Sequence, residues 1–393
     1  MTDNLAKDIF PKVNVMGRSG RAGVLGSMDG CTKCGICHSH CPVANVTNAF
    51  PGPKYTGPQA ERFRTIEKTS EVSPLLCSGC GVCTSVCPNN VAIADIITLA
   101  KAGLMQDGRK VSMGQRLLNR PNLIGRFASI TPFISNVLLN NYLIRQCMEV
   151  LFGIHREAPL PKVYGRKFAK WFSKRKQPDG PIISYFTGCA VTNYDPYVGI
   201  ALIKVLNFLG YRVKIPTDLC CSLPMLSSGE MDAAAPRARE VINELYSSAI
   251  RKEKIISTST SCSLTVKSKY GLYLNMTDQS TSSVSNAIFD ACEFLRDYHI
   301  ESLQSYLRPI CKEVLYHGPC QLRGHSMGQP ALEVLNLIPG LKVKISEADC
   351  CGIGGTYGYE KNKYRISNLI GKTLRDQVRE CQPDIIICDS ETC

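Results

Sequence analysis

Cysteine is the residue type that carries most of the chemistry in this sequence, because 21 of the 393 residues are cysteines. Two pairs are adjacent in the chain, Cys220–Cys221 in "DLCCSLP" and Cys350–Cys351 in "ADCCGIGGTYG". Adjacent cysteines are poor disulfide partners, since ring closure strains the peptide bond between them. The start of the chain has no apolar signal-peptide core, and in a reducing compartment cysteines are more often metal ligands than bridges. We therefore expect most of these thiols to bind metal.

A longer cysteine pattern occurs twice near the start of the chain. "CTKCGICHSHCP" and "CSGCGVCTSVCP" both follow C-x2-C-x2-C-x3-C-P, the signature of bacterial-type ferredoxins with two [4Fe-4S] clusters, in which the fourth cysteine of each run binds the other cluster. The expected ligands of cluster one are Cys31, Cys34, Cys37 and Cys87, and those of cluster two are Cys77, Cys80, Cys83 and Cys41. Zinc is the rival, but structural zinc sites use pairs of ligands rather than such triplets.

The C-terminal half of the chain repeats itself. "VLYHGPC" echoes "ISYFTGC", and "DIIICDSETC" echoes "KIISTSTSC". Four pairs of cysteines are separated by 130 or 131 residues: Cys189 and Cys320, Cys220 and Cys350, Cys221 and Cys351, and Cys262 and Cys393. Matched offsets of this kind indicate an internal duplication with one candidate site in each unit.

Strands and helices are expected to hold these cysteines in place. Residues 91–105 have apolar positions at spacings of three and four and predict a helix. From residue 181 onward, short strand-like runs alternate with helical segments such as 196–210 and 230–252, which predicts a parallel sheet covered by helices. In both units the cysteines follow predicted strand ends, the edge at which open α/β sheets usually place their sites.

These patterns divide the chain into five parts. We expect a polar, mobile leader over 1–30 and an α+β ferredoxin-like domain with two clusters over 31–100. A basic linker of short amphipathic helices is expected over 101–180, followed by two α/β repeats over 181–310 and 311–393.

The net charge of +13 comes mostly from the linker, where 101–180 carries 15 Lys and Arg against four Asp and Glu. Segment 165–176 mixes basic residues with Phe168, Trp171 and Phe172, and anionic membrane surfaces attract this composition. The alternatives are a solvated linker or helices docked on an acidic partner. The apolar run without charge over 127–144 is too polar to cross a bilayer. The absence of a recognition module argues against nucleic acid as a partner.

From about residue 31 onward the chain resembles the C-subunit family of anaerobic glycerol-3-phosphate dehydrogenase. The resemblance rests on the two ferredoxin motifs, on "FPGPKYTGPQAERFR" between them, and on "YFTGC", "YHGPC" and "CCGIGGTYGYE". The duplicated half is more distantly similar to the B subunit of heterodisulfide reductase, thiol:fumarate reductase, and the iron–sulfur subunits of lactate and glycolate oxidase. In that wider group the repeat is called the CCG domain and can hold a non-cubane cluster. The resembling family continues past position 393 into a closing helix, which leads us to expect a longer natural chain.

Carried over by position, the resemblance implies two further iron–sulfur sites. The first CCG site would use Cys189, Cys220, Cys221 and Cys262, and the second CCG site would use Cys320, Cys350, Cys351 and Cys393. Ser222 stands where the CCG motif has glycine, and Ser259 and Ser390 replace the first cysteine of a terminal C-x2-C. Each site therefore keeps four thiolates rather than five, although Cys388 could substitute in the second. The alternative is that one repeat is empty and structural.

The remaining cysteines and two histidines are expected to be structural. Cys147, Cys292, Cys311 and Cys381 have no motif partners and are interpreted as small, buried apolar side chains. Glycine-rich 352–358 does not match a nucleotide-binding fingerprint and is expected to let the backbone approach a cluster. His317 and His325 flank Cys320, and either could hydrogen-bond a cluster sulfur or a quinone, but a structural role is the expectation for both.

The expected function is electron transfer in anaerobic respiration. No flavin or nicotinamide fingerprint is present, so substrate oxidation, which the resemblance implies is that of glycerol-3-phosphate, would belong to a flavin-containing dehydrogenase partner. Electrons would pass singly through this chain to membrane quinone, either at the membrane surface or through a membrane-anchored quinone-reactive partner. The expected location is cytoplasmic and peripheral, on the inner face of the cell membrane. The alternatives are a catalytic heterodisulfide or thiol:fumarate reductase subunit, which the missing cysteines disfavour, and a redox sensor or assembly scaffold.

Overall fold

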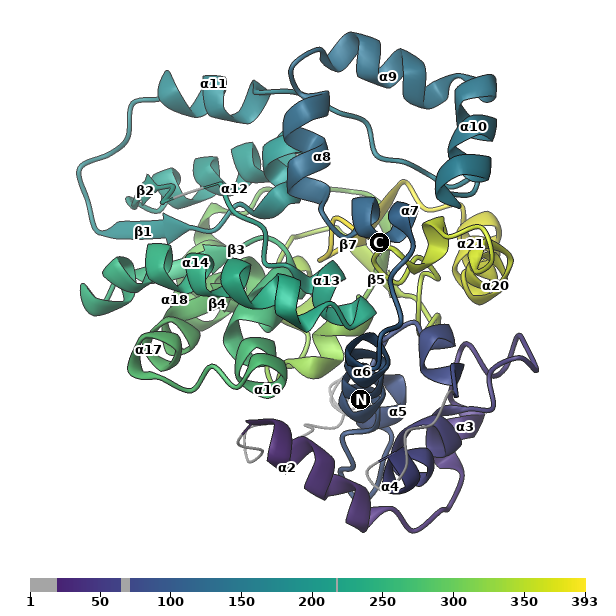
Figure 1. Ribbon diagram of the computed structural model, residues 1–393. Coiled ribbons are helices and arrows are strands. Elements are labelled where there is room, and N and C mark those ends of the chain that lie inside the picture. Colours follow the sequence, from purple (N-terminus) through teal and green to yellow (C-terminus); the bar gives the residue numbers. More distant parts are fainter. Residues whose placement is uncertain (1–19, 65–70, 217) are drawn as a thin grey trace.

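The structure is a computed structural model that describes residues 20–64, 71–216 and 218–393. Figure 1 shows the N-terminal cysteine-rich part at the bottom, two α/β units above it, and a group of linker helices arching over the top. The later linker helices, within 121–173, thus lie far from the N-terminal part, whereas the start of the linker lies close to it.

The N-terminal part consists of short helices between cysteine-bearing loops, and its longest helix is α6 (Ile93–Gln106). Most side chains of α6 are buried, which agrees with the helix predicted over 91–105. Helices α3 (Ile36–Ser39) and α5 (Val82–Ser85) each begin after a left-handed glycine, Gly35 or Gly81, at the same place in the two motifs. Glycine adopts this conformation without steric cost, so each loop can curl its cysteines toward a common point.

The expected mobile leader is helical in its described part. Residues 1–19 lie outside the described residues, whereas Gly20–Gly26 forms α2. Val24 of α2 is fully buried in a core shared with α6 and with α16 (Tyr270–Leu274), because α2 packs against both helices. Apolar burial therefore attaches this segment to the first repeat.

The first repeat is built on a four-stranded parallel sheet in the order β2-β1-β3-β4. Its strands are β1 (Ile182–Tyr185), β2 (Arg212–Lys214), β3 (Lys254–Ser257) and β4 (Ile288–Asp290). Neighbouring side chains of a strand face opposite sides of its sheet. Accordingly, Ile255 packs in a core with α14 (Met231–Ile250) and α17 (Gln279–Ala287), while Ile256 packs in a second core with α12 (Pro196–Phe208) and α18 (Ala291–Tyr306).

The second repeat contains a three-stranded parallel sheet in the order β6-β5-β7. Its strands are β5 (Glu313–His317), β6 (Lys342–Ile345) and β7 (Ile385–Cys388), and its helices are α19 (Pro330–Leu335), α20 (Tyr364–Ile370) and α21 (Lys372–Cys381). This order matches β2-β1-β3 of the first repeat strand for strand. The predicted parallel sheets are therefore confirmed, while β4 is a further strand that the sequence analysis did not predict.

The linker forms five helices, as its apolar spacing predicts: α7 (Met113–Leu118), α8 (Pro121–Ala128), α9 (Pro132–Asn140), α10 (Tyr142–Phe152) and α11 (Lys167–Ser173). Asn119, at the end of α7, is fully buried and anchors the linker to the first repeat. Its amide donates hydrogen bonds to Ser228 Oγ at 2.6 Å and Glu230 Oε2 at 2.5 Å. Buried polar side chains of this kind fix the position of neighbouring elements because leaving them unpaired is costly.

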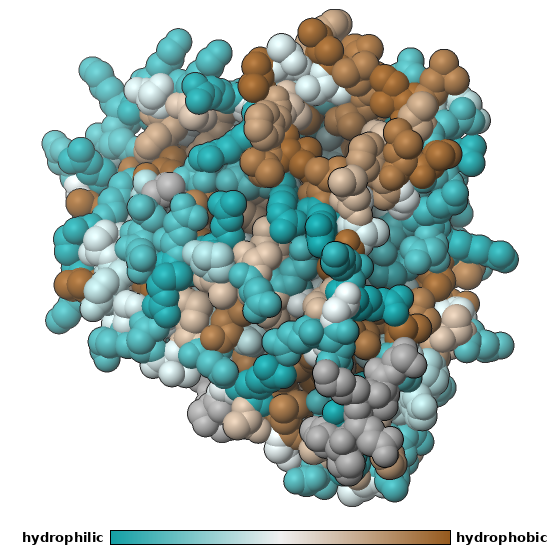
Figure 2. Space-filling model, viewed as in Figure 1, coloured by the Kyte–Doolittle hydropathy of each residue, from teal (hydrophilic) through white to brown (hydrophobic). Residues whose placement is uncertain are grey.

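Exposed apolar side chains gather on α8, α9, α10 and the turns between them. Figure 2 shows them as the brown area at the top, above the same helices in Figure 1. We call this area the arch surface; its members are Phe127, Ile130, Phe133, Ile134, Val137, Leu138, Tyr142, Leu143, Val150 and Leu151. Such contiguous apolar surfaces on soluble proteins mark contact with a partner or a membrane.

Within the described ranges, no helix is long and apolar enough to cross a bilayer.

The aromatic side chains of segment 165–176, expected at a membrane surface, pack inward. Phe168 on α11 is buried against Tyr185 of β1, and Trp171 and Phe172 are half-buried against the same core. Arg175 stacks on Trp171 and donates a hydrogen bond to Asn207 of α12 at 2.8 Å. The sequence pattern identified an amphipathic helix correctly, but the structure uses its apolar face to cover the first repeat.

Candidate iron–sulfur sites

The first group of cysteines joins both ferredoxin motifs. Cys31, Cys34 and Cys37 line one small cavity together with Cys87 of the second motif. Burial, followed by the proximity of Cys31, Cys87 and Cys34, raises the pKa of Cys37 to about 11. The amide of Val91 donates a hydrogen bond to Cys87 Sγ at 3.4 Å. The structure thus brings together the four cysteines expected to share cluster one.

The second group has the complementary composition, with Cys77, Cys80 and Cys83 joined by Cys41 of the first motif. Burial raises the pKa of Cys83, and Cys77, Cys80 and Cys41 add to the effect because they are close. The amides of Gly79 and Ala44 donate to the sulfurs of Cys77 and Cys41, at 3.4 and 3.5 Å. Each motif therefore gives its fourth cysteine to the other group, as the spacing predicts.

The first CCG site lies at the carboxyl ends of β1 and β3. Cys189 follows β1, and its sulfur is 3.9 Å from that of Cys220. Cys262 lies on α15 (Thr260–Leu264), directly after β3. Hydrogen bonds from Cys220 and then Cys262 lower the pKa of Cys221, so Cys221 occupies the centre of the group. This sheet edge is where parallel α/β folds place their sites.

The second CCG site repeats this arrangement at the ends of β5 and β7. Hydrogen bonds from Cys350 and then Cys393 lower the pKa of Cys351, which is the central thiol, as Cys221 is in the first site. The interaction with Cys350 also lowers the pKa of Cys320. Cys388, the possible substitute ligand, contacts Cys393 and contributes to the raised pKa of that thiol.

Backbone amides also point at the adjacent cysteine pairs in matching positions. Ser222 N–H donates to Cys220 Sγ at 3.4 Å, and Gly352 N–H donates to Cys350 Sγ at 3.3 Å. Amide hydrogen bonds stabilise anionic sulfur and are a standard feature around iron–sulfur clusters. The four groups of thiols, most of them buried or half-buried, therefore have the donor set that iron–sulfur clusters require.

Ser222, which stands where the CCG motif has glycine, adopts a strained backbone conformation. Ser222 has φ +60° and Gly352 has φ +91°, so both residues occupy the left-handed region that disfavours residues with a Cβ. At Gly352, moreover, a Cβ would collide with the carbonyl oxygen of Ser367. The first repeat tolerates a serine here as local strain, whereas the second repeat has space for glycine alone.

The two serines that replace cysteines lie where the repeats meet. Ser390 Oγ is 3.4 Å from Ser261 Oγ, and Thr260 donates through its amide and its hydroxyl to the carbonyl of Asp389, at 3.3 and 2.7 Å. Both Ser259 and Ser390 are buried. The loops that end the two sites therefore bind each other, which the sequence alone did not indicate.

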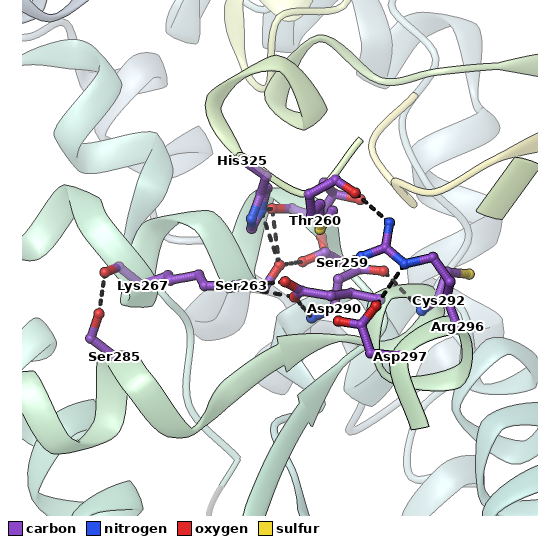
Figure 3. Close-up of polar contacts among 12 residues, drawn as sticks. Ser259, Thr260, Ser263, Lys267, Ser285, Asp290, Cys292, Arg296, Asp297 and His325 are labelled. Carbon is purple, nitrogen blue, oxygen red and sulfur yellow. Dashed lines mark hydrogen bonds and ion pairs between the residues drawn. The ribbon is translucent and has the colours of Figure 1, made fainter. Parts of the chain in front are cut away.

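His325 supports this junction. Figure 3 shows His325 above Thr260 and Ser263, and its Nε2 donates to the Thr260 carbonyl at 3.0 Å. Burial lowers the pKa of His325 to about 4, so the imidazole is neutral at physiological pH. The structural role expected for His325 is confirmed; His317, by contrast, faces the sulfurs of the second CCG site.

The second group of cysteines lies directly against the second CCG site. Cys80 and Cys320 line the same narrow cavity of about 60 Å³, and Cys80 packs in one apolar core with Cys350. Gln321 bridges the two parts, because its amide donates to the carbonyl of Gly79 at 3.3 Å and its oxygen accepts from buried Lys269 at 2.7 Å. Burial lowers the pKa of Lys269, while the nearby thiols of Cys320 and Cys221 oppose this shift. The Lys269 amine thus lies near thiols of both CCG sites.

A larger cavity of about 690 Å³ opens on the other side of cluster two. Its lining includes Cys77, the apolar residues Leu76, Met105, Leu118, Leu151 and Phe152, and the polar residues Ser78, Lys101, Gln115, Tyr357 and Lys363. Among the described residues, Ser78 Oγ, Gln115 Oε1 and Tyr357 OH are buried without a hydrogen-bond partner. No motif marks this cavity, because it is formed by residues from separate segments of the chain.

The cysteines without motif partners are not uniformly buried, contrary to expectation. Cys147 and Cys311 are exposed, while Cys292 and Cys381 are half-buried. Cys147 lies on the outer part of α10, and Cys381 accepts a hydrogen bond from Lys344 at 2.9 Å.

Comparison with known proteins agrees with this arrangement. Residues 27–91 match the model of the 4Fe-4S dicluster domain, and residues 183–267 and 314–393 match the Cysteine-rich domain called CCG. The C subunit of anaerobic glycerol-3-phosphate dehydrogenase from Escherichia coli strain K12 is 31% identical over 375 residues, which cover 93% of each chain. The chain belongs to this C-subunit family. The resemblance inferred from its motifs is therefore confirmed.

More distant relatives of this C-subunit family member belong to reductases. The B subunit of fumarate reductase (CoM/CoB) from Methanothermobacter marburgensis is 26% identical, and the match covers 91% of this chain and 65% of the relative. The D subunit of dihydromethanophenazine:CoB–CoM heterodisulfide reductase from Methanosarcina acetivorans is 24% identical, and the match covers 84% of this chain and 78% of the relative. Most of this chain thus has a counterpart in these reductase complexes.

Replacing the residue after each adjacent cysteine pair tests the difference between the repeats. We expect Gly352→Ser to destabilise the protein on the order of 3 kcal/mol and to deplete iron at the second CCG site, since Ser367 blocks its Cβ. The matched variant Ser222→Gly removes strain and should change stability by less than about 1 kcal/mol. Thermal unfolding and iron analysis measure both effects. Equal behaviour of the two variants would contradict the steric argument.

Proposed function

We propose that this chain is the iron–sulfur electron-transfer subunit of a dehydrogenase complex, carrying electrons from a flavin-containing partner to membrane quinone. Iron–sulfur clusters bound at the four thiol groups would supply one-electron acceptor and donor chemistry. The observation that carries the proposal is the packing of cluster two's Cys80 beside Cys320 and Cys350 of the second CCG site. That packing supports a continuous series of sulfur sites within one chain.

We assign the ligands as the four groups that the structure brings together. They are Cys31, Cys34, Cys37 and Cys87 for cluster one; Cys41, Cys77, Cys80 and Cys83 for cluster two; Cys189, Cys220, Cys221 and Cys262 for the first CCG site; and Cys320, Cys350, Cys351 and Cys393 for the second. The protein's part is to keep these thiols together, to exclude water from them and to donate backbone hydrogen bonds to sulfur.

Anaerobic iron and sulfide analysis tests this assignment. The purified chain should hold about sixteen irons if all four sites are filled, and Cys351→Ala should lose about four of them. The matched variant Cys147→Ala, which changes an exposed cysteine outside all four groups, should lose none. A colourless, iron-free wild-type protein contradicts the function, whereas a content of about eight irons restricts it to the ferredoxin part.

The cavity of about 690 Å³ beside Cys77 has the properties of a quinone site. A quinone needs an apolar slot for its ring and tail and hydrogen-bond donors for its carbonyl oxygens. The lining supplies the slot through Met105, Leu118 and Phe152, and the unpartnered hydroxyls of Ser78 and Tyr357 supply the donors. Lys101, which donates to the carbonyls of Cys77 and Ser227, closes the inner end.

Removing one hydroxyl tests this cavity without disturbing the fold. Tyr357→Phe should raise the concentration of a short-chain naphthoquinone needed for half-maximal oxidation of the reduced holoprotein by about tenfold, because one hydrogen bond to the quinone is lost. Its stability should stay unchanged, since that hydroxyl has no partner among the described residues. The control is Tyr306→Phe, at an exposed position on α18. Unchanged quinone dependence in Tyr357→Phe would place the quinone elsewhere.

The arch surface supports peripheral attachment to the inner face of the cell membrane. Leu151 belongs both to this surface and to the lining of the cavity, so the cavity opens toward the apolar face. Insertion of an apolar helix face into the bilayer interface provides binding, and cationic side chains add attraction to anionic lipids. A quinone could then enter the cavity without crossing water.

Liposome binding tests the arch surface. Phe133→Glu, at a position 80% exposed on α9, should reduce binding to anionic liposomes at least about tenfold, because it replaces an aromatic contact with lipid by a charge. Ile250→Glu, at a position 61% exposed on α14, is the matched control and should bind as wild type. Equal loss in both variants, or no loss in Phe133→Glu, argues against the arch surface as the membrane contact.

A catalytic reductase role is the second candidate, and one observation favours it. Cys388 brings a fifth thiol to the second CCG site, where it contacts Cys393. Relatives of this chain include subunits of a heterodisulfide reductase and a fumarate reductase. The first CCG site has four grouped thiols, with Ser259 at its fifth position, so any such chemistry belongs to the second site.

A further inference from the structure

His317 is a buried histidine whose side chain lacks the support that buried polar groups usually have. It ends β5, is 2% exposed, and neither of its ring nitrogens has an oxygen or nitrogen hydrogen-bond partner among the described residues. The His317 ring instead contacts the Cys351 thiol. An unpaired polar atom in the interior costs about 1–3 kcal/mol. His325, on the other side of Cys320, shows the usual solution, because its Nε2 bonds to a carbonyl. The polypeptide therefore supports the His317 ring with sulfur rather than with an oxygen acceptor.

The ring of His317 faces sulfur. One of its nitrogens and the sulfurs of Cys351 and Cys393 all lie within 4.8 Å of one another. Ligands of one tetrahedral metal, bound at about 2.0–2.3 Å, stand about 3.5–4 Å apart. Small side-chain adjustments thus suffice for the three atoms to share a metal ion.

The duplication offers an internal comparison. The residue equivalent to His317 in the first repeat is Phe186, in "YFTGC" against "YHGPC". Phe186 is buried in an apolar core beside Cys221 and Cys262, where it can only pack. The histidine is therefore not needed to build the repeat, and its presence distinguishes the second CCG site from the first.

We propose that His317 is an iron ligand of the second CCG site, binding through an imidazole nitrogen beside Cys351 and Cys393. This inference rests on the proposed function, because it requires iron at that site. His317 would then add a neutral imidazole to the four thiolates of this site, a ligand that the first site, with Phe186 in its place, does not have.

Pulsed EPR of the reduced, iron-loaded protein tests the proposal, with ¹⁵N labelling at histidine. Wild type should show a strongly coupled histidine nitrogen on the cluster signal. His317→Phe, which copies the first repeat, should lose this coupling while its second site keeps iron on the four remaining cysteines, as the first site does. His317→Cys should likewise show no coupling. His325→Gln leaves the ring of His317 in place and should therefore retain the wild-type coupling.

The outcomes separate this inference from the proposed function. In one outcome, iron loss in Cys351→Ala shows that the second site holds iron in wild type, but the nitrogen coupling is weak. His317 is then a hydrogen-bond donor to sulfur. This result overturns only the assignment of His317 as a ligand and leaves the proposed function intact. A strong coupling that persists in His317→Cys also overturns that assignment. A second site without iron in wild type overturns both proposals.

Discussion

Holding several thiols close together inside a protein raises its free energy, and the rest of the structure must compensate for this. Buried sulfurs resist ionisation, and each thiolate raises the pKa of its neighbours, as at Cys37 and Cys83. A polypeptide that gathers such groups in four sets gains stability from them only when cations neutralise the negative charge. The backbone amides that donate to the sulfurs of Cys220 and Cys350 reduce this electrostatic cost, while the glycine turns before α3 and α5 let the cysteine loops approach a common point.

The two repeats hold their thiols with the same arrangement of strands and loops. In both repeats the carboxyl ends of two parallel strands supply the outer cysteines, and the loop after a third strand supplies the adjacent pair. The second cysteine of each pair becomes the central thiol. The copies differ at particular positions, with Ser222 against Gly352 and Phe186 against His317. Such differences allow one backbone design to hold two sites of unlike properties.

Local patterns in the sequence predicted much of this molecule. Cysteine spacing indicated the composition of the two ferredoxin-type groups, the offsets of 130 and 131 residues indicated the repeats, and apolar residues at spacings of three and four indicated α6. Features formed by distant residues left no such pattern. The inward packing of Phe168, the junction of Thr260 with Asp389, and the packing of Cys80 beside Cys320 all join segments that are separated in the chain. Nothing in the residue types alone distinguished His317 from His325, since their roles depend on which atoms lie opposite each ring.

The junction between the two repeats also bears on how the protein is made. Thr260, beside the last cysteine of the first CCG site, hydrogen-bonds to Asp389, and Thr258 bonds to Glu391. Because a ribosome produces these segments roughly 130 residues apart, the earlier loop emerges long before the segment that holds it in place. The first repeat is therefore completed only after the second has been made, and its thiols must stay reduced until then.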